Sequence, residues 1–168
     1  MGALNLTLNV TLNSTLLTAQ LAKMRGHKVY FDTNIIIYVI NNTLEFVDVC
    51  IPFFEAIENG DIIGCSSDVT VAELLVKPMQ TNDMLAISNI KAMFDVGGYF
   101  ETFAHDRVTF ELAAHIRATK GLKFIDALHT ATAINNGCGY IVTNDKPLAR
   151  KVAGIEAVDI KDFLINTL

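Results

Sequence analysis

Four acidic residues occupy positions from which carboxylates could act together on a ligand: Asp32, Glu73, Asp126 and Asp145. The first and the last each follow a short apolar run typical of a buried strand, at residues 28–31 and 140–143. In parallel α/β folds, ligands bind where such strands end. The other two lie in segments of helical period, and Glu73 shares its predicted face with Val69, Ala72 and Val76. If the fold joins these segments, they form an acidic pocket.

A pocket of this kind predicts a bound divalent cation. Carboxylates a few ångströms apart raise one another's pKa, so they cannot all stay ionised without a positive partner. Oxygen ligands without cysteine or paired histidine select Mg²⁺ or Mn²⁺ over zinc. Such ions can activate a water and stabilise charge on a phosphoryl group, in some sites as a pair about 4 Å apart. The expected chemistry is hydrolysis of a phosphodiester.

Each carboxylate also has a purely structural interpretation, which the sequence leaves open. Asp32 or its neighbours could cap the following helix, and Asp126 suits the first turn of a helix because of the helix dipole. Asp145 precedes Lys146-Pro147 and could form a turn. Glu73 would sit in an apolar face, so it needs a cationic partner or a place at the edge of that face, in water. The case for a site depends on all four together.

Composition limits the classes of function. The net charge of −5 argues against a protein that grips nucleic acid over its whole surface, so any such contact must be local. Three widely spaced cysteines, Cys50, Cys65 and Cys138, indicate reduced structural thiols in a cytosol and neither a disulfide framework nor a zinc site. No apolar run approaches the roughly 20 residues that span a bilayer. We therefore expect a cytoplasmic protein without a membrane anchor.

The order of elements predicts an α/β fold with a central, mostly parallel sheet in a single domain of residues 28–168. Strands are expected at residues 28–31, 61–65, 140–143 and 155–158, with an edge strand near 99–102. Helices are expected at residues 34–41, 44–59, 68–76, 82–96, 106–119, 124–136 and 160–166, with Pro78 ending the third.

Residues 1–27 differ from the rest and are interpreted as an N-terminal extension of uncertain role. Residues 4–12 alternate leucine or valine with asparagine and threonine, which is the period of a half-buried strand. Met24 stands just before the first convincing core strand. We take it as a candidate native start, with the residues before it a tag or an over-long reading frame.

From about Lys28 to Leu164 the sequence resembles the PIN-domain family, and within it the VapC toxins of prokaryotic toxin–antitoxin pairs. The resemblance is in four segments in the same order: Tyr30 to Asn34, Thr70 to Leu74, Phe124 to His129 and Ile141 to Asp145. It implies a three-layer α/β/α domain and an Mg²⁺- or Mn²⁺-dependent endoribonuclease. Asp32, Glu73, Asp126 and Asp145 would be the catalytic, metal-binding carboxylates, and Thr33, Asn34, Thr143 and Asn144 would support them or contact phosphate.

The resemblance also implies partners. It suggests an RNA substrate, a homodimer and a cognate antitoxin whose tail places a basic side chain in the acidic pocket. RNA could be contacted by basic residues that are otherwise ordinary surface charges: Arg107, Arg117, Lys120, Lys123 and Lys146. His129, one helical turn after Asp126, is interpreted as a packing or supporting histidine ahead of a proton-transfer group.

Three other functions remain open. An RNA-processing nuclease would use the same site without an antitoxin, and a binding module would keep the fold without catalysis. An aspartyl phosphatase would use Asp32 as nucleophile, but that chemistry wants a second aspartate where Asn34 stands. The four filled acidic positions favour the nuclease.

Overall fold

The computed structural model of the chain describes residues 9–95, 98–152 and 154–167. At its centre lies a five-stranded sheet in which every pairing is parallel. In spatial order the strands are β4 (Glu101–Phe103), β3 (Ile63–Ser67), β2 (Lys28–Phe31), β5 (Tyr140–Thr143) and β6 (Glu156–Asp159). The predicted parallel sheet is confirmed, and β2 is its middle strand.

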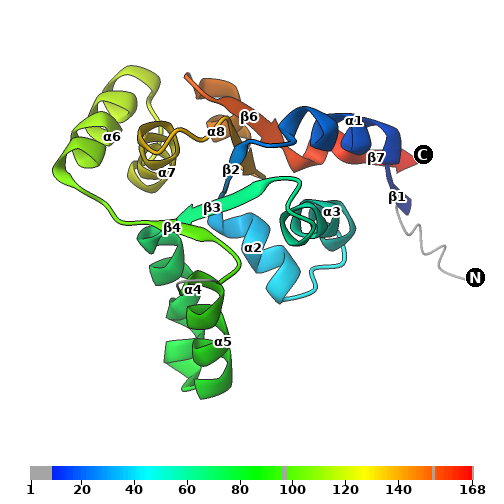
Figure 1. Ribbon diagram of the computed structural model, residues 1–168, viewed down its shortest axis with the longest axis horizontal. Coiled ribbons are helices and arrows are strands. Elements are labelled where there is room, and N and C mark those ends of the chain that lie inside the picture. Colours follow the sequence, from blue (N-terminus) through cyan, green and yellow to red (C-terminus); the bar gives the residue numbers. More distant parts are fainter. Residues whose placement is uncertain (1–8, 96–97, 153, 168) are drawn as a thin grey trace, which may run out of the picture.

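Helices cover both faces of this sheet (Figure 1). One face packs against α1 (Ser14–Met24), α2 (Thr33–Ile40) and α3 (Val47–Glu58). The other packs against α7 (Phe124–Asn135) and α8 (Lys146–Lys151), and α6 (Arg107–Lys120) in turn packs against α7. Alternation along β2 produces the two layers, because Val29 and Phe31 enter the first core and Tyr30 enters the second. The predicted three-layer α/β/α architecture is confirmed.

The remaining two helices, α4 (Asp68–Thr81) and α5 (Met84–Phe94), form a hairpin that projects from the body (Figure 1). The prediction that Pro78 ends the third helix is wrong. The helix continues for one more turn and stops at Asn82, which adopts the left-handed conformation with φ 54°. Thr81 donates a hydrogen bond to the carbonyl of Lys77, so one of the acceptors near the helix end keeps a partner.

The predicted C-terminal helix over residues 160–166 is also wrong. The chain forms a 3₁₀ turn, η1 (Ile160–Phe163), and then a strand, β7 (Leu164–Thr167). Ile160 and Phe163 are both buried, and their spacing of three suits a 3₁₀ turn as well as an α-helix. The strand depends on a partner far away in sequence, β1 (Asn9–Leu12), which pairs with it antiparallel. A local pattern could not reveal that partner.

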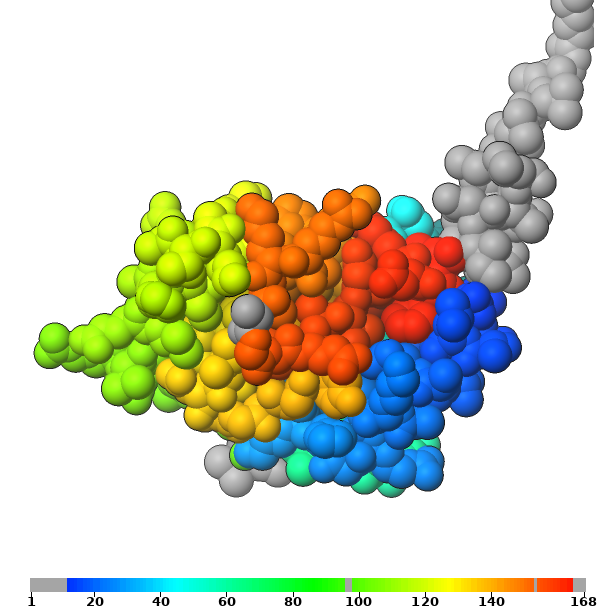
Figure 2. Space-filling view, turned by 90° about the horizontal axis from the view of Figure 1, so that it is seen from above, coloured from blue at the N-terminus to red at the C-terminus, as the bar shows by residue number. Residues whose placement is uncertain are grey.

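The N-terminal segment packs onto the domain. Of the strand predicted at residues 4–12, residues 9–12 form β1 and residues 4–8 lie outside the described part. Helix α1, absent from the predictions, begins at the side-chain cap of Asn13 and buries Leu17 and Met24. It lies beside the C-terminal segment in Figure 2, where α1 is blue and the C-terminal segment red. The start at Met24 stays a prediction, but a chain beginning there would lack these contacts.

We expect Leu17→Ala to lower the free energy of unfolding by about 2–4 kcal/mol, the usual effect of emptying a buried leucine site. Leu17 is 3% exposed, whereas its neighbour Leu16 is 51% exposed. The matched control Leu16→Ala should change stability by less than about 0.5 kcal/mol. Urea denaturation of both variants checks this. Equal, small effects would mean that α1 does not pack on the domain in solution.

The other predicted elements agree with the structure to within a few residues, apart from α8, which was not predicted. All three cysteines are free and buried, as structural thiols should be. Within the described residues, none of the helices has both the length and the apolar character needed to cross a membrane.

Candidate functional site

Asp32 lies at the carboxyl end of the central strand and is 6% exposed. It occupies the N-cap position of α2, yet its side chain makes no capping hydrogen bond. Its Oδ2 instead accepts a hydrogen bond of 2.8 Å from the hydroxyl of Thr143 at the end of β5. Burial raises the pKa of Asp32, and that hydrogen bond offsets part of the effect. The capping interpretation therefore does not explain this carboxylate.

Asp126 is close enough to Asp145 and Asp32 to feel their charge. It stands in the first turn of α7, where Lys123 occupies the N-cap position. Burial raises the pKa of Asp126, and the charges of Asp145 and Asp32 raise it further. Two other predicted carboxylates, both at strand ends, thus raise the pKa of this one on α7. Such repulsion is the electrostatic signature expected of an acidic site.

Asp145 has a structural role as well. Its Oδ1 accepts a hydrogen bond of 2.8 Å from the backbone N–H of Leu148 and so caps α8. Its own backbone N–H donates to the hydroxyl of Thr143 at 2.9 Å. One threonine hydroxyl therefore links Asp145 to Asp32. The structural interpretation of Asp145 is therefore correct in that its side chain caps a helix. Its charge also raises the pKa of Asp126.

Glu73 reaches the same place from α4, but the face predicted for it is wrong. Ala72, Glu73 and Val76 are exposed, and α4 buries Thr70, Leu74 and Leu75 instead. The Glu73 side chain is 39% exposed and accepts a hydrogen bond of 2.5 Å from the hydroxyl of Thr33. A hydrogen bond from His129, followed by that from Thr33, lowers the pKa of Glu73. The alternative that placed Glu73 at an edge in water was the right one.

A cavity of about 370 Å³ opens where these elements meet. Its polar lining comes from α2, α4 and α7, and its apolar rim from Ile37, Val76 and Ile125. The polar residues are Asp32, Thr33, Asn34, Glu73, Asp126 and His129. Asp145 is not part of this lining and is connected to it through Thr143. Asn144, predicted as a supporting or phosphate-contacting residue, lies outside this lining and donates to the hydroxyl of Tyr38 at 2.6 Å.

The PIN-domain sequence profile matches residues 29–154. The chain belongs to the PIN-domain family. No curated protein sequence matches it.

Several solved structures share the fold of this PIN domain. The VapBC2 complex of Rickettsia felis bound to promoter DNA contains a chain with TM-score 0.61 and 20% identity, over 79% of this chain and 98% of that one. A chain of DNA-bound VapBC from Salmonella typhimurium has a TM-score of 0.56 and 23% sequence identity, over 80% of this chain and 98% of that one. A chain of a toxin–antitoxin complex from Klebsiella pneumoniae has a TM-score of 0.54 and 21% sequence identity, over 79% of this chain and 97% of that one. At these identities the likeness is one of fold.

The donor set of the PIN domain suits a hard cation. Asp32 and Asp126 offer carboxylate oxygens in this cavity, and burial raises the pKa of both, so a bound cation would stabilise their ionised forms. Among the described residues, no three histidine, cysteine or acidic side chains form a ready-made metal cage. Mg²⁺ does not require one, because it is commonly held by one or two carboxylates, waters and the phosphates of a substrate. The residues present fit such an ion.

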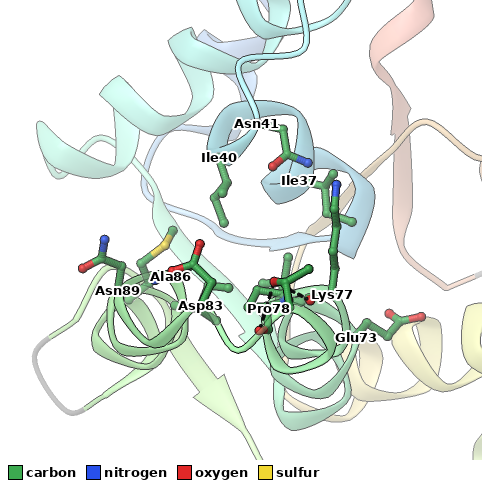
Figure 3. Close-up of a pocket in the computed structure, with 13 residues that line it drawn as sticks. Ile37, Ile40, Asn41, Glu73, Lys77, Pro78, Asp83, Ala86 and Asn89 are labelled. Atoms are coloured by element: carbon green, nitrogen blue, oxygen red, sulfur yellow. Dashed lines mark hydrogen bonds between the residues drawn. The ribbon is translucent and has the colours of Figure 1, made fainter.

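A second cavity of about 400 Å³ borders the acidic one, since Ile37 and Glu73 line both. It is a groove between α2 and the α4–α5 hairpin. In Figure 3, Ile37, Ile40 and Asn41 lie on one side and Pro78 and Ala86 on the other. The groove leads to the acidic pocket.

The predicted basic residues differ in their relation to the pocket. Lys123, at the start of α7, lowers the pKa of Asp126 by its charge. Arg107 is engaged in an exposed ion pair with Glu111, with 2.8 Å between Nε and Oε1. Arg117, Lys120 and Lys146 are exposed. Lys123 is therefore the predicted cation with an electrostatic link to the site.

The interpretation of His129 as a packing or supporting residue fits its position in the structure. The residue is 1% exposed and lines the acidic cavity, with its Nε2 atom 3.4 Å from Glu73 Oε2. The signal was its spacing of three from Asp126, which puts both side chains on one face of α7. Its supporting contacts with Tyr30 come from a strand that the sequence alone could not place against α7.

Proposed function

We propose that this PIN-domain protein is an Mg²⁺- or Mn²⁺-dependent endoribonuclease and the toxin of a toxin–antitoxin pair. The observation that supports this best is the convergence of Asp32 and Asp126 in one cavity, where the charges of Asp32 and Asp145 raise the pKa of Asp126. Carboxylates held close together in a partly buried site destabilise it when no cation is bound, and such an arrangement is retained when a cation binds there. The shared fold with VapBC proteins agrees with the toxin assignment.

In the proposed reaction, Asp32 and Asp126 would hold the ion, with Glu73 and Asp145 at its periphery. When bound, the cation supplies charge neutralisation at the phosphate and activation of a water. Thr143 holds the Asp32 carboxylate by its 2.8 Å hydrogen bond and so fixes one oxygen of the site. Thr33 does the same for Glu73. Asn34, which lines the cavity and is exposed, is placed to contact a substrate phosphate.

The test is cleavage of RNA by the purified protein with Mg²⁺ or Mn²⁺. We expect strand scission that stops on addition of EDTA and returns when excess Mn²⁺ is added. Asp32→Asn should abolish scission while keeping the circular dichroism spectrum of the folded protein. Cleavage that persists in EDTA, or in the Asp32→Asn variant, would contradict the metal mechanism. A folded protein that binds RNA without cutting it would indicate the binding module.

For the partner, we propose an antitoxin that lies in the apolar groove and reaches the acidic pocket with a basic side chain. The groove joins the pocket at Ile37 and Glu73, so an extended segment or helix lying in it would end beside Asp32. A cation there would relieve the same repulsion that a metal ion relieves. An RNA substrate and an antitoxin partner both imply a cytoplasmic location, and a homodimer stays a prediction for sedimentation to check.

We expect Ile40→Asp to weaken antitoxin binding by roughly 100-fold or more, because it puts a charge into an apolar contact. Ile40 lines the groove and is 43% exposed, so the free protein should fold normally. Exposed Ile63, outside the groove, supplies the matched control Ile63→Asp. The measurement is affinity for the product of the adjacent short gene, with RNA cleavage in parallel. Equal affinities for both variants would contradict the groove assignment.

A further inference from the structure

We propose that His129 is a positioning residue, which holds Glu73 and Asp32 through its Nε2–H because buried hydroxyls of Tyr30 and Ser67 fix the tautomer of its imidazole. The consequence for metal binding rests on the proposed function. The tautomer itself does not, because it follows from contacts within the protein.

The first step concerns the nitrogen that faces the carboxylates. His129 Nε2 lies 3.4 Å from Oε2 of Glu73 and 3.7 Å from Oδ1 of Asp32. Thr33 Oγ1 is also 3.4 Å away, but its hydroxyl proton already goes to Glu73. A bare nitrogen lone pair facing two carboxylate oxygens would be repelled by both, whereas an N–H is attracted. Nε2 therefore carries the hydrogen.

The second step concerns the other nitrogen. Nδ1 of His129 lies 2.8 Å from the hydroxyl oxygen of Tyr30, and that oxygen lies 2.6 Å from Oγ of Ser67. In a neutral imidazole with hydrogen on Nε2, Nδ1 can only accept. Tyr30 must then donate to Nδ1, and Ser67 must donate to Tyr30. Burial raises the pKa of Tyr30, so its phenol keeps the proton that this chain requires.

Both hydroxyl donors, Tyr30 and Ser67, lie in the buried central sheet. Tyr30 lies on the central strand, paired with Cys65 of β3 and Ile141 of β5, and its side chain is fully buried. Ser67 is also fully buried and occupies the N-cap position of α4. Its hydroxyl makes no capping hydrogen bond there. A serine hydroxyl at this position usually caps the helix, but here it is hydrogen-bonded to Tyr30. This is the arrangement expected if its role is to orient the histidine.

A histidine that only fills space would not need a fixed tautomer, and this difference can be measured. Long-range ¹H–¹⁵N correlation spectra of the metal-free protein report which nitrogen of His129 carries hydrogen. We expect the Nε2–H form in the wild type and a mixture of both tautomers in Tyr30→Phe. Titration calorimetry with Mn²⁺ alone should then show about tenfold weaker binding by Tyr30→Phe, the usual effect of losing a residue that orients a metal ligand.

Tyr99→Phe is the matched control. Tyr99 donates its hydroxyl hydrogen to the carbonyl of Phe54 at 2.8 Å and lines neither cavity. It should lose a hydrogen bond without changing the His129 tautomer or the Mn²⁺ affinity. Ser67→Ala, which removes only the far donor, should shift both readouts in the same direction as Tyr30→Phe and by less. It also provides the test if Tyr30→Phe fails to fold.

His129 itself supplies a rescue experiment. His129→Gln keeps an N–H donor near the position of Nε2 and should retain most of the Mn²⁺ affinity, whereas His129→Leu should lose it. A wild-type spectrum with hydrogen on Nδ1, or a Tyr30→Phe protein identical to wild type in tautomer and affinity, overturns the proposal. Failure of the wild type to bind Mn²⁺ would contradict the proposed nuclease, and the tautomer measurements would still decide the role of Tyr30 and Ser67.

Discussion

Asp126→Asn is expected to reduce metal-dependent RNA cleavage by about 10²–10³-fold while it stabilises the metal-free protein. The loss of activity follows from removing one of the two carboxylates that line the cavity and are proposed to hold the ion. The gain in stability follows from removing a charge that Asp145 and Asp32 repel. A residue that served the fold alone would show neither the loss nor the gain.

The sign of the stability effect follows from the direction of the pKa shift. A carboxyl whose pKa is raised on folding is destabilising when ionised, so asparagine stabilises at neutral pH. The gain should fade as the pH falls far enough to protonate Asp126 in both states. We expect a rise in melting temperature of roughly 1–3 °C, because the half-exposed side chain is partly screened by solvent. Differential scanning calorimetry in EDTA measures it.

Asp48→Asn is the matched control for this experiment. Asp48 stands in the first turn of α3, as Asp126 does in α7, but it is exposed and outside the acidic cavity. It should leave cleavage unchanged and slightly destabilise the protein, by the favourable interaction it loses with the helix dipole. Excess Mn²⁺ should stabilise the wild type and not Asp126→Asn, because a ligand stabilises only the form that binds it. A metal-free Asp126→Asn protein less stable than wild type would contradict the repulsion argument.

The sequence predicted the parallel sheet well because two of its inner strands, β2 and β5, are short apolar runs that are almost wholly buried. It also predicted which edge of the sheet carries Asp32 and Asp145, since both follow such runs directly. This local information needs no knowledge of packing. The positions of the two helical carboxylates were harder, because a helix can turn either face to its neighbour.

Glu73 shows the difficulty. The i, i+3, i+4, i+7 spacing of Val69, Ala72 and Val76 suggested a buried face, but α4 belongs to a hairpin and buries Thr70 and Leu74 instead. Spacing identifies a candidate face, and the partner helix decides between faces. The wrong helix prediction for residues 160–166 has a related cause, since β7 pairs with β1, about 150 residues away; the alternating pattern of residues 4–12 predicted a strand there but not its partner. Long-range pairing leaves no local signature.

Thr143→Val is expected to reduce cleavage by about 10–100-fold and to destabilise the protein by about 1–3 kcal/mol. The substitution keeps the shape of a fully buried side chain and removes only its hydroxyl. That hydroxyl donates to Asp32 at 2.8 Å and accepts from the backbone N–H of Asp145 at 2.9 Å. Valine would leave a buried carboxylate without its donor and free the Asp145 backbone from the strand end.

Thr132→Val separates this effect from the general effect of changing a buried threonine. Thr132 is also fully buried, but its hydroxyl donates to the carbonyl of Leu128, one turn back in α7. That carbonyl also accepts a backbone hydrogen bond within the helix. Loss of the threonine hydroxyl should therefore have a small effect on stability and none on RNA cleavage. The measurements are the rate of RNA cleavage and the urea denaturation curve of each variant. Equal cleavage by the two would mean that Thr143 only fills space, and the link between Asp32 and Asp145 would then have no part in the site.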